Sequence, residues 1–448
     1  MNHPYLPLTT SERKQMEKAI GISDIEKLFA MIPCAIRSQA NFELPAYNEV
    51  ELKKIFSQWA EENTPVTKVI SFLGAGAYEH AIPSALGNLL SRSEFYTAYT
   101  PYQPEINQGL LQAFFEYQSL ISNLTGMDIT NASMYDGPTA LAEATILALR
   151  FTKKSEVIVL SGLNPEAEKV LRTYTHNLKI NLRFLPYKAD NKEQSLESAL
   201  NDQTAAVIIQ NPDFFGNLSS LTELIRMIHE SNALAIIYIN DPVSLGILEP
   251  PGTQGADLVV GEAQSFGLPL SFGGPYLGFF SAKKEFLRNI PGRLVGKTTD
   301  LEGKEGFVLT LQTREQHIRR ERASSNICSN QALCALAATI YLSLLGPEGL
   351  KEVAWSTVKN SHYLFSQLTR IPSVKAGLEQ PFFHEFTITL GTNLASFLPK
   401  IKAKGFLPGY SLEQYAPEHS GMFLLYTSEL RTKEEMDKFC EELEGCLP

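Results

Sequence analysis

Two polar positions stand at the ends of neighbouring predicted strands, about two dozen residues apart. Residues 236–281 predict a strand that ends in Asp241, a second strand over 256–260, a polar loop and a glycine-rich turn, in the run IIYINDPVSLGILEPPGTQGADLVVGEAQSFGLPLSFGGPYLGFFS. The polar loop contains Gln264 and Ser265. Parallel sheets bind ligands at the carboxyl ends of their strands, and Asp241 and Ser265 are both expected at that edge.

An acid that closes one strand, with a functional group after the next, is typical of enzymes that hold pyridoxal phosphate (PLP). In that class the acid pairs with the pyridinium nitrogen and a lysine forms the Schiff base. Here the acid is Asp241, but Ser265, preceded by Gln264, stands where the lysine is expected, and no lysine occurs between Lys192 and Lys283. A hydroxyl cannot replace the primary amine that an imine requires. The residues therefore predict a PLP-enzyme fold that has lost its cofactor lysine, with Asp241, Gln264 and Ser265 as vestigial positions.

Composition excludes several other classes of function. The 448 residues are enough for two or three domains, and the net charge of -10 argues against a nucleic-acid binder, which needs a positive surface. Five cysteines without a C-x-x-C pair predict a reducing compartment and no metal site. The N-terminus lacks the apolar region of a signal peptide, and the longest apolar run (333–345) is too short to cross a bilayer. We expect a soluble, cytoplasmic protein.

The elements that position these residues follow three patterns along the chain. Residues 1–65 predict a helical arm, in which Thr9-x-x-Glu12 and Ser23-x-x-Glu26 both match the capping box. From about 107, helices alternate with short apolar strands, which predicts an α/β domain (66–325) whose mostly parallel sheet is covered by helices. A linking helix and a smaller C-terminal α/β domain are expected over 326–448. The expected strands of the sheet are 157–160, 180–185, 205–210, 234–239, 256–260 and 276–280, and the first two helices are 107–125 and 137–152.

Two glycine motifs fail as nucleotide-binding signatures. Gly74-Ala-Gly76 follows a short predicted strand, but Glu79 stands where a dinucleotide fingerprint has its third glycine. Gly296-Lys297-Thr298 resembles the end of a P-loop, but Pro291 stands where the first glycine is required. We reject both the NAD and the ATPase interpretations.

Two further segments are candidates for binding. The segment 93–105 carries Tyr96, Tyr99 and Tyr102 on a loop stiffened by two prolines, which suits either simple packing or the wall of a cleft. Residues 283–322 hold ten basic residues against six acidic ones, which indicates that an anion binds nearby. For residues 317–322, which include Arg319 and Arg320, a solvated helix face is a strong alternative.

Several long segments are far more specific than any short motif, among them FLGAGAYEHAIP, SRSEFYTAYTPYQPEINQG, LTGMDITNASMYDGPTA, FGLPLSFGGPYLG, PGRLVGKTTDLEGKEGFVLTLQTREQHIRRERASSNICSNQAL and LAATIYLSLLGPEGL. They closely resemble the N-terminal half of glycine decarboxylase, the P-protein of the glycine cleavage system. The resemblance covers nearly the whole chain, and a length of 448 without a second half resembles subunit 1 of the form of this protein that is split into two chains.

The resemblance implies a fold-type I PLP-transferase-like fold and a role in a heteromeric oxidoreductase. It implies that a second subunit of similar fold carries PLP and that together they decarboxylate glycine, releasing CO2. The aminomethyl group then passes to the lipoyl disulfide of the H carrier protein. This chain is expected to bind no PLP covalently, to be inactive alone, and to complete the cleft at a dimer interface. Its candidate residues for the partner's site or for a channel are Tyr96, Tyr99, Tyr102, Arg293, Thr298, Arg319 and Arg320.

Two other functions stay open at this point. The chain is alternatively a competent PLP enzyme such as an aminotransferase, although the lysine-free stretch 193–282 argues against this. It is otherwise a stand-alone regulatory protein with a PLP-enzyme fold. A visible aldimine absorbance would favour the first alternative, and the absence of a second-half gene would favour the other.

Overall fold

A seven-stranded sheet forms the centre of the larger of two units into which the chain divides, Met1–Thr64 and Pro65–Pro448. A computed structural model describes residues 5, 8–37, 44–96, 100–186, 192–327, 330–378, 380–391, 394–415 and 419–447. The strands are β2 (Ile129–Thr130), β3 (Glu156–Val159), β4 (Asn181–Phe184), β5 (Thr204–Gln210), β6 (Leu234–Ile239), β7 (Leu258–Glu262) and β8 (Gly278–Ala282). Their order is β2-β8-β7-β6-β5-β3-β4. The five strands β3 to β7 are parallel, β8 is antiparallel to β7, and β2 is antiparallel to β8. The expected mostly parallel sheet is confirmed.

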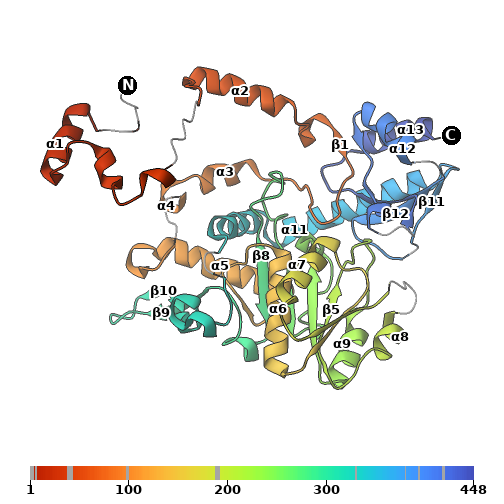
Figure 1. The fold of residues 1–448 in the computed structure, drawn as a ribbon. Coiled ribbons are helices and arrows are strands. Elements are labelled where there is room, and N and C mark those ends of the chain that lie inside the picture. Colours follow the sequence, from red (N-terminus) through yellow and green to blue (C-terminus); the bar gives the residue numbers. More distant parts are fainter. Residues whose placement is uncertain are drawn as a thin grey trace. The chain divides into compact units, whose positions relative to one another are not determined.

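Helices cover both faces of the sheet (Figure 1). They are α5 (Gln108–Thr125), α6 (Gly137–Thr152), α7 (Pro165–Thr175), α8 (Lys192–Glu197) and α9 (Leu221–Glu230). Side chains alternate across a strand, so on β5 Val207 and Ile209 pack with α5, α8 and α9 in one core. Ala206 and Ile208 pack with α6 and α7 in the opposite core.

Strands β7 and β8 each lie two residues later than the sequence predicted. Asp257 precedes β7 because its carboxylate accepts from Ala235 N (2.8 Å) and pairs with Lys283, which fixes the entrance of the strand. Pairing with β8 then continues to Glu262, opposite Gly278. The shift leaves Gln264 and Ser265 in the loop directly after β7, as expected.

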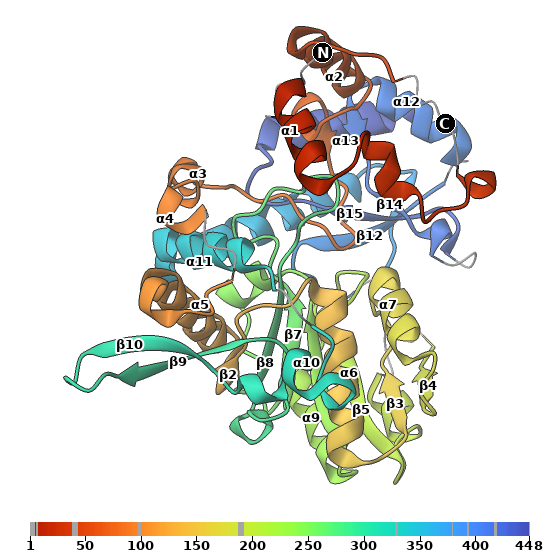
Figure 2. The ribbon, with the colours of Figure 1, turned by 60° about the vertical axis from the view of Figure 1, so that its left-hand side comes forward.

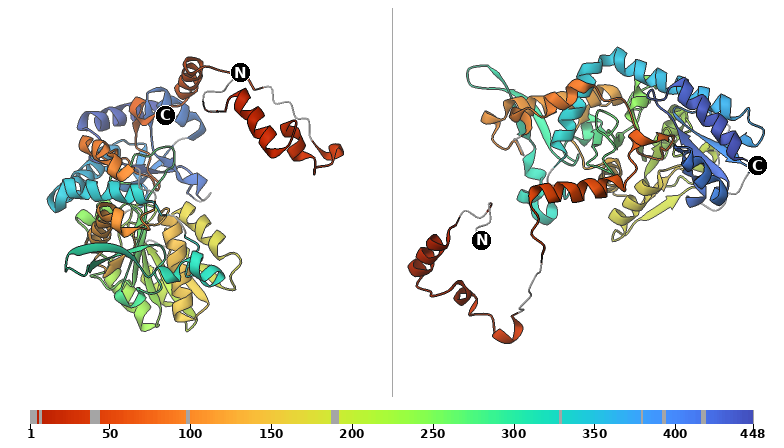
Figure 3. Two further views of the ribbon diagram at one scale, coloured as in Figure 1. Left: turned by 90° about the vertical axis from the view of Figure 1, so that its left-hand side faces the viewer. Right: turned by 90° about the horizontal axis from the view of Figure 1, so that it is seen from above.

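The C-terminal part of the larger unit is a small α/β domain around an antiparallel sheet in the order β11-β12-β15-β14. Its elements are β11 (Val374–Ala376), β12 (Glu385–Leu390), α12 (Leu394–Ala403), β13 (Phe406–Leu407), β14 (Tyr410–Ser411), β15 (Met422–Tyr426) and α13 (Lys433–Cys446). They lie together as the blue segments in Figure 3. Strand β1 (Ile70–Ser71) pairs with β13, and Phe72 lies in this domain's core. Residues 70–72 therefore pack with the small domain, although the sequence placed them in the large one.

Helix α11 (Ala332–Leu368) links the two sheets. It is long and apolar enough to span a membrane by length and composition, but 50% of its most apolar stretch is buried in the protein. Gly346 interrupts it with a positive φ of 64°, and Pro347 follows directly. The buried side chains of its first half, such as Leu336 and Tyr341, belong to the core beneath the large sheet. It is the core helix that the sequence predicted.

The unit Met1–Thr64 holds helices without a core of their own. Its elements are α1 (Thr10–Ile20), η1 (Ile25–Phe29), η2 (Cys34–Ile36) and α2 (Glu49–Glu61), and none of them has a buried residue. The predicted capping box of Thr9 and Glu12 is confirmed. The one predicted at Ser23 is wrong, because Asp24 caps η1 by accepting from Glu26 N at 2.7 Å.

Three smaller features of the larger unit lie outside the two sheets described above. Helix α3 (Ser84–Leu90) precedes the segment 93–105, in which α4 (Ser93–Tyr96) and a 3-10 turn that begins at Pro104 are formed. Residues 100–103, between them and among the described residues, are not helical, in agreement with the prediction. Strands β9 (Leu294–Thr299) and β10 (Glu305–Thr310) form a hairpin beside α5 (Figure 2). Gly296-Lys297-Thr298 lies within β9 and forms no phosphate loop. Helix α10 (Gln316–Arg319) is a single turn that ends before Arg320, whose φ is 51°.

Candidate functional site

Asp241 and Ser265 meet at the carboxyl edge of the large sheet, as the sequence predicted. Asp241 follows β6 and caps a short 3-10 helix, η5 (Pro242–Gly246), by accepting from Val243 N at 3.1 Å. Ser265 Oγ donates to Asp241 Oδ1 at 2.7 Å. Both side chains are buried. Asp241 Oδ1 is thus already bound by groups of the chain itself.

Two histidines contact the other oxygen of Asp241. His80 Nε2 lies 3.0 Å and His384 Nε2 lies 2.9 Å from Asp241 Oδ2. His80 comes from the loop that follows β1, and His384 directly precedes β12 of the small domain. Burial opposes ionisation of Asp241, but the two imidazoles outweigh it and hold the pKa of this carboxyl well below its ordinary value. Asp241 is therefore a carboxylate at neutral pH.

His80 lies between two carboxylates. Its Nδ1 is 2.8 Å from Glu429 Oε2, and Glu429 Oε1 accepts from Ala81 N at 2.7 Å. Burial alone lowers the pKa of His80, but Asp241 and Glu429 outweigh it and raise that pKa to about 10. His80 is consequently an imidazolium at neutral pH, and it joins the end of β6 to the small domain.

Tyr78, two residues before His80, fills the space beside this ion pair. Its hydroxyl donates to Glu385 Oε2 at 2.8 Å and accepts from Asn240 Nδ2 at 3.1 Å. Its ring centroid lies 4.6 Å from that of His384 and 5.1 Å from that of Tyr426. The segment 74–81 is thereby inserted between the large sheet and the small domain.

The glycines of this segment explain why it mimicked a dinucleotide motif. A Cβ on Gly74 would lie 2.5 Å from Glu385 Oε1 and 2.7 Å from Tyr426 Cβ. Gly76 has a φ of +118°, which side chains rarely tolerate, and a Cβ there would lie 2.5 Å from Asn164 Nδ2. These glycines permit close approach of protein to protein, and no nucleotide is needed to account for them.

The residues at this edge of the sheet do not fit PLP. Ser265 supplies no amine, and both oxygens of Asp241 are bound by side chains of the chain. The backbone donors that begin α6, at the same edge, are bound by carboxylates: Gly137 N donates to Glu262 Oε2 at 2.9 Å and Thr139 N to Asp136 Oδ1 at 2.7 Å. A helix N-terminus that is already bound to two acidic side chains is a poor phosphate site. Burial raises the pKa of Glu262 to about 7, against the effect of three backbone donors.

Sequence reasoning found three of the residues at this site and missed the others. Gln264, expected beside Ser265, accepts from Tyr78 N (3.3 Å) and donates to Leu268 O (2.6 Å). His80, His384, Glu385 and Glu429 were missed because they come from distant parts of the chain with no common spacing. One signal was present in the sequence: Tyr78, Glu79 and His80 stand between apolar segments. The structure buries Tyr78 and His80, and buried polar side chains of this kind need partners.

Among the described residues that were proposed to reach a partner, the structure brings Arg293 and Tyr102 together. Arg293 Nη2 donates to Tyr102 OH at 3.1 Å, and the guanidinium carbon lies 5.3 Å from the centre of that ring. Tyr96 is exposed at the end of α4, and Tyr99 lies outside the described residues. Thr298, Arg319 and Arg320 are exposed on the β9–β10 hairpin, on α10 and just beyond α10.

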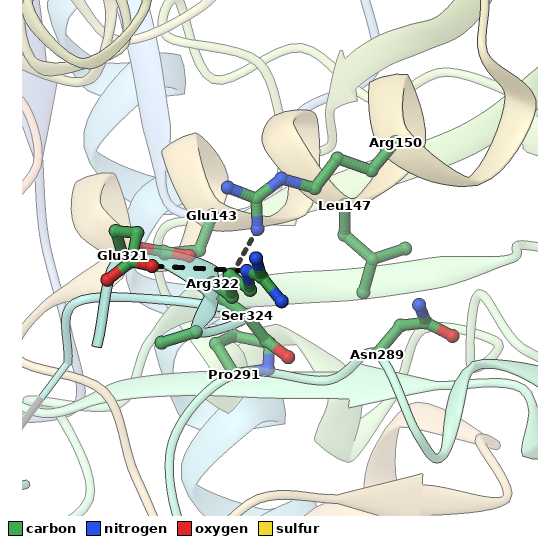
Figure 4. A pocket seen from close by; sticks show the side chains of 9 residues that line it. Glu143, Leu147, Arg150, Asn289, Pro291, Glu321, Arg322 and Ser324 are labelled. Carbon is green, nitrogen blue, oxygen red and sulfur yellow. Dashed lines mark hydrogen bonds and ion pairs between the residues drawn. The ribbon is translucent and has the colours of Figure 1, made fainter. Parts of the chain in front are cut away.

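Two of the cavities that described residues line adjoin α6 and the ends of β3 and β4, away from Asp241. One, of about 330 Å³, lies between α6 and the segment 289–291, and Figure 4 shows Arg150 reaching across it to Ser324 O. The other, of about 620 Å³, opens beyond the ends of β3 and β4 near Tyr410 and Tyr415. Among the described residues no group of three potential metal ligands occurs.

The large sheet and its helices have the fold of the fold-type I class of PLP-dependent enzymes, and Asp241 stands at the end of β6. A Lactobacillus brevis glutamate decarboxylase shares the fold, with a TM-score of 0.70, 13% identity, and 92% of this chain and 94% of that chain covered. The sequence model of the glycine cleavage system P-protein matches residues 3–443. The chain belongs to that P-protein family.

Similar proteins cover the whole chain. A probable glycine dehydrogenase (decarboxylating) subunit 1 from Geobacillus kaustophilus is 47% identical, and one from Shouchella clausii is 48% identical. The matches cover 99% of this chain and 99% of the relative in the first case, and 98% of each in the second. The crystal structure of a glycine decarboxylase (P-protein) of the glycine cleavage system in inhibitor-bound form has a TM-score of 0.90 and 40% identity, and each chain is covered in full (100%).

Proposed function

We propose that this chain is the subunit of a two-chain glycine decarboxylase that does not anchor PLP. The observation that carries the proposal is the strand-end acid Asp241, which is bound by Ser265, His80 and His384 where a PLP enzyme needs a free carboxylate and a nearby lysine. Relatives that are named subunit 1 and match over nearly their full length support a split enzyme. In this proposal the second subunit, of similar fold, binds PLP, and the assembly is cytoplasmic.

The proposed reaction is that of the glycine cleavage system. Glycine loses CO2, and its aminomethyl group passes to the lipoyl disulfide of the H carrier protein, which is reduced. PLP on the second subunit would accept the electrons released by decarboxylation. This chain contributes no nucleophile or cofactor, and its role is to complete the cleft, exclude water from it and orient what binds there.

Two surfaces of this chain are proposed to serve those roles. The tyrosine loop (Tyr96, Tyr99 and Tyr102) and the segment from Arg293 to Thr298 are proposed to face the partner's site, supported by the contact between Tyr102 and Arg293. Arg319 and Arg320, both exposed, are proposed to attract the carrier.

Co-expression with the second subunit tests the proposal. The two chains are expected to co-purify, and the complex to exchange CO2 with the carboxyl group of glycine when the H carrier protein is added. The chain alone is expected to show no exchange and no covalent PLP after borohydride reduction. If the chains fail to associate, the stand-alone regulatory alternative is favoured. A PLP adduct on the chain alone would favour the aminotransferase-like alternative.

A further inference from the structure

Arg293 is a buried arginine whose described partners are all neutral. Its side chain is 4% exposed, and its Nη1 and Nη2 donate to Asn330 Oδ1 (3.2 Å) and Tyr102 OH (3.1 Å). Among the described residues its Nε has no acceptor, and the partners of its two terminal nitrogens carry no charge. In the sequence, the segments outside the described residues that precede Tyr102 and Asn330, 97–99 and 328–329, contain only Thr, Ala, Tyr, Cys and Ser.

A second cation adjoins the same segment. Arg314 Nη2 donates to the backbone oxygen of Gly292 at 2.7 Å, and its Nε has no acceptor among the described residues. The carboxylate of Glu315, next in the chain, lies 3.5 Å from His317 Nδ1 and forms no ion pair with Arg314. Burial lowers the pKa of Arg314 to about 10, with Glu315 opposing the shift. Arg314 is still a cation at neutral pH.

An unneutralised guanidinium in the interior is costly unless something compensates it. Proteins compensate such a charge with a carboxylate, with solvent or with a bound anion, and the described residues around Arg293 supply no carboxylate. One more donor is unused beside it: Asn330 offers its oxygen to Arg293, and its Nδ2 has no acceptor. What is missing at this place is an acceptor with negative charge.

The cluster also borders solvent. Tyr102, which accepts from Arg293, has 53% of its surface exposed, so a small ligand can approach along this ring. An oxyanion matches the guanidinium because two of its oxygens can accept parallel hydrogen bonds.

We propose that Arg293, with Asn330 Nδ2 and Tyr102 OH, forms a binding site for a small oxyanion, and that Arg314 adds positive potential to it. The ligand chemistry is a carboxylate or phosphate group. The source of that group, but not the site itself, depends on the proposed function. Under that function the candidates are the carboxylate of glycine and the phosphate of the cofactor held by the second subunit.

The test uses the full chain alone and three probes: inorganic phosphate, acetate and glycine. Each is titrated by calorimetry and by thermal denaturation at constant ionic strength, with chloride as the reference anion. At least one probe is expected to bind and to raise the Tm relative to chloride, because ligands of the folded state stabilise it. Arg293→Gln is expected to weaken this binding at least about tenfold, the factor that a charge-assisted hydrogen bond contributes. Arg314→Gln is expected to weaken it less.

Matched variants separate this site from its surroundings. Arg293→Lys keeps the charge without the planar fork, so it should bind better than Arg293→Gln and worse than the unmodified chain. Arg150→Gln removes an arginine of the cavity in Figure 4, whose guanidinium already donates to Ser324 O, and should leave binding unchanged.

Three outcomes would overturn the proposal. In the first, none of the three probes binds to the unmodified chain. In the second, Arg293→Gln binds the probe as well as the unmodified chain does. In the third, Arg150→Gln loses the binding that Arg293→Gln keeps. Preference among the probes assigns the source: phosphate alone indicates the cofactor group, and acetate with glycine indicates the substrate carboxylate. Failure of the two subunits to associate would reject the proposed function but would leave this result intact, because the second subunit takes no part in it.

Discussion

At Asp241 a protonated imidazole of the chain occupies the electrostatic role that a pyridinium nitrogen has in PLP enzymes. His80 presents an N–H to the strand-end carboxylate at 3.0 Å, and Glu429 binds the opposite ring nitrogen at 2.8 Å. Removing one member of a buried ion pair leaves the other uncompensated, which typically costs about 3–5 kcal/mol. Asp241 therefore has a structural role that does not depend on a lysine at position 265.

This arrangement predicts that Ser265→Lys does not create a PLP enzyme. The introduced ammonium would enter a site whose carboxylate is already shared by His80 and His384, and it would pair with Asp241. We expect no covalent PLP on the variant after borohydride reduction, measured by mass spectrometry. Ser265→Ala serves as the control for folding. A stoichiometric adduct on the lysine variant would show that the site is open to the cofactor.

The His80 ion pairs also predict how stability depends on pH. Near neighbours raise the pKa of His80 to about 10 in the folded chain, against about 6.5 for an unfolded histidine. A raised pKa means that the folded state holds the proton more tightly than the unfolded state. The contribution of protonated His80 to the free energy of unfolding is therefore full below pH 6.5 and is lost as pH rises toward 10. The Tm should therefore fall between pH 6.5 and 9.5.

His80→Gln isolates this contribution. The variant should have a lower Tm at neutral pH and a flatter pH profile over the same range. His229→Gln is the matched control, because His229 pairs with Asp257 at 2.8 Å but its side chain is 39% exposed. Equal slopes for the unmodified chain and His80→Gln would mean that His80 is neutral when buried.

At the scale of elements, regular segments were predictable and the contacts between them were not. Helix α6 was predicted over 137–152, and its start is fixed locally because Asp136 caps it by accepting from Thr139 N. The irregular segment 74–81 carries no periodic pattern, so its insertion beside Asp241 was not predicted. Its partners Glu385 and Tyr426 lie more than 300 positions away in the sequence, beyond the reach of any local pattern.

The inserted segment predicts contrasting effects for two glycine substitutions. Gly74→Ala would place a Cβ 2.5 Å from Glu385 Oε1 and 2.7 Å from Tyr426 Cβ, and we expect a loss of stability of about 1–3 kcal/mol from overpacking. Gly87→Ala in α3 meets nothing within 4 Å, and should instead stabilise by about 0.5–1 kcal/mol through helix propensity. Denaturant titration of both variants tests the pair. A neutral Gly74→Ala would mean that the segment does not pack closely in solution.

At the scale of the whole molecule, charge is unevenly distributed along the chain. The chain has a net charge of -10, yet the segment 283–322 carries an excess of basic residues. Within it, Arg293 is buried, whereas Arg319 and Arg320 are exposed. The segment therefore divides into an inner part suited to a small anion and an outer part accessible to a macromolecule.

That division yields a prediction for carrier docking within the proposed complex. Exposed charges act mainly on the rate of association and are screened over roughly 8 Å at physiological ionic strength. If the lipoyl carrier has an acidic surface, changing Arg319 and Arg320 to Glu should raise its apparent KM several-fold and flatten the dependence of that KM on salt. The KM for glycine should change little, because glycine is too small to depend on a surface patch.

A second pair of reversals distinguishes local docking from overall charge. Changing Lys400 and Lys402, exposed on α12, to Glu alters the net charge of the complex by the same amount at another place. This variant should keep the carrier KM close to that of the unmodified complex at every salt concentration. Equal effects of the two pairs would mean that only net charge matters. Loss of glycine binding with unchanged carrier kinetics would instead place Arg319 and Arg320 at the substrate, because a contact to the glycine carboxylate persists at high salt where a steering charge does not.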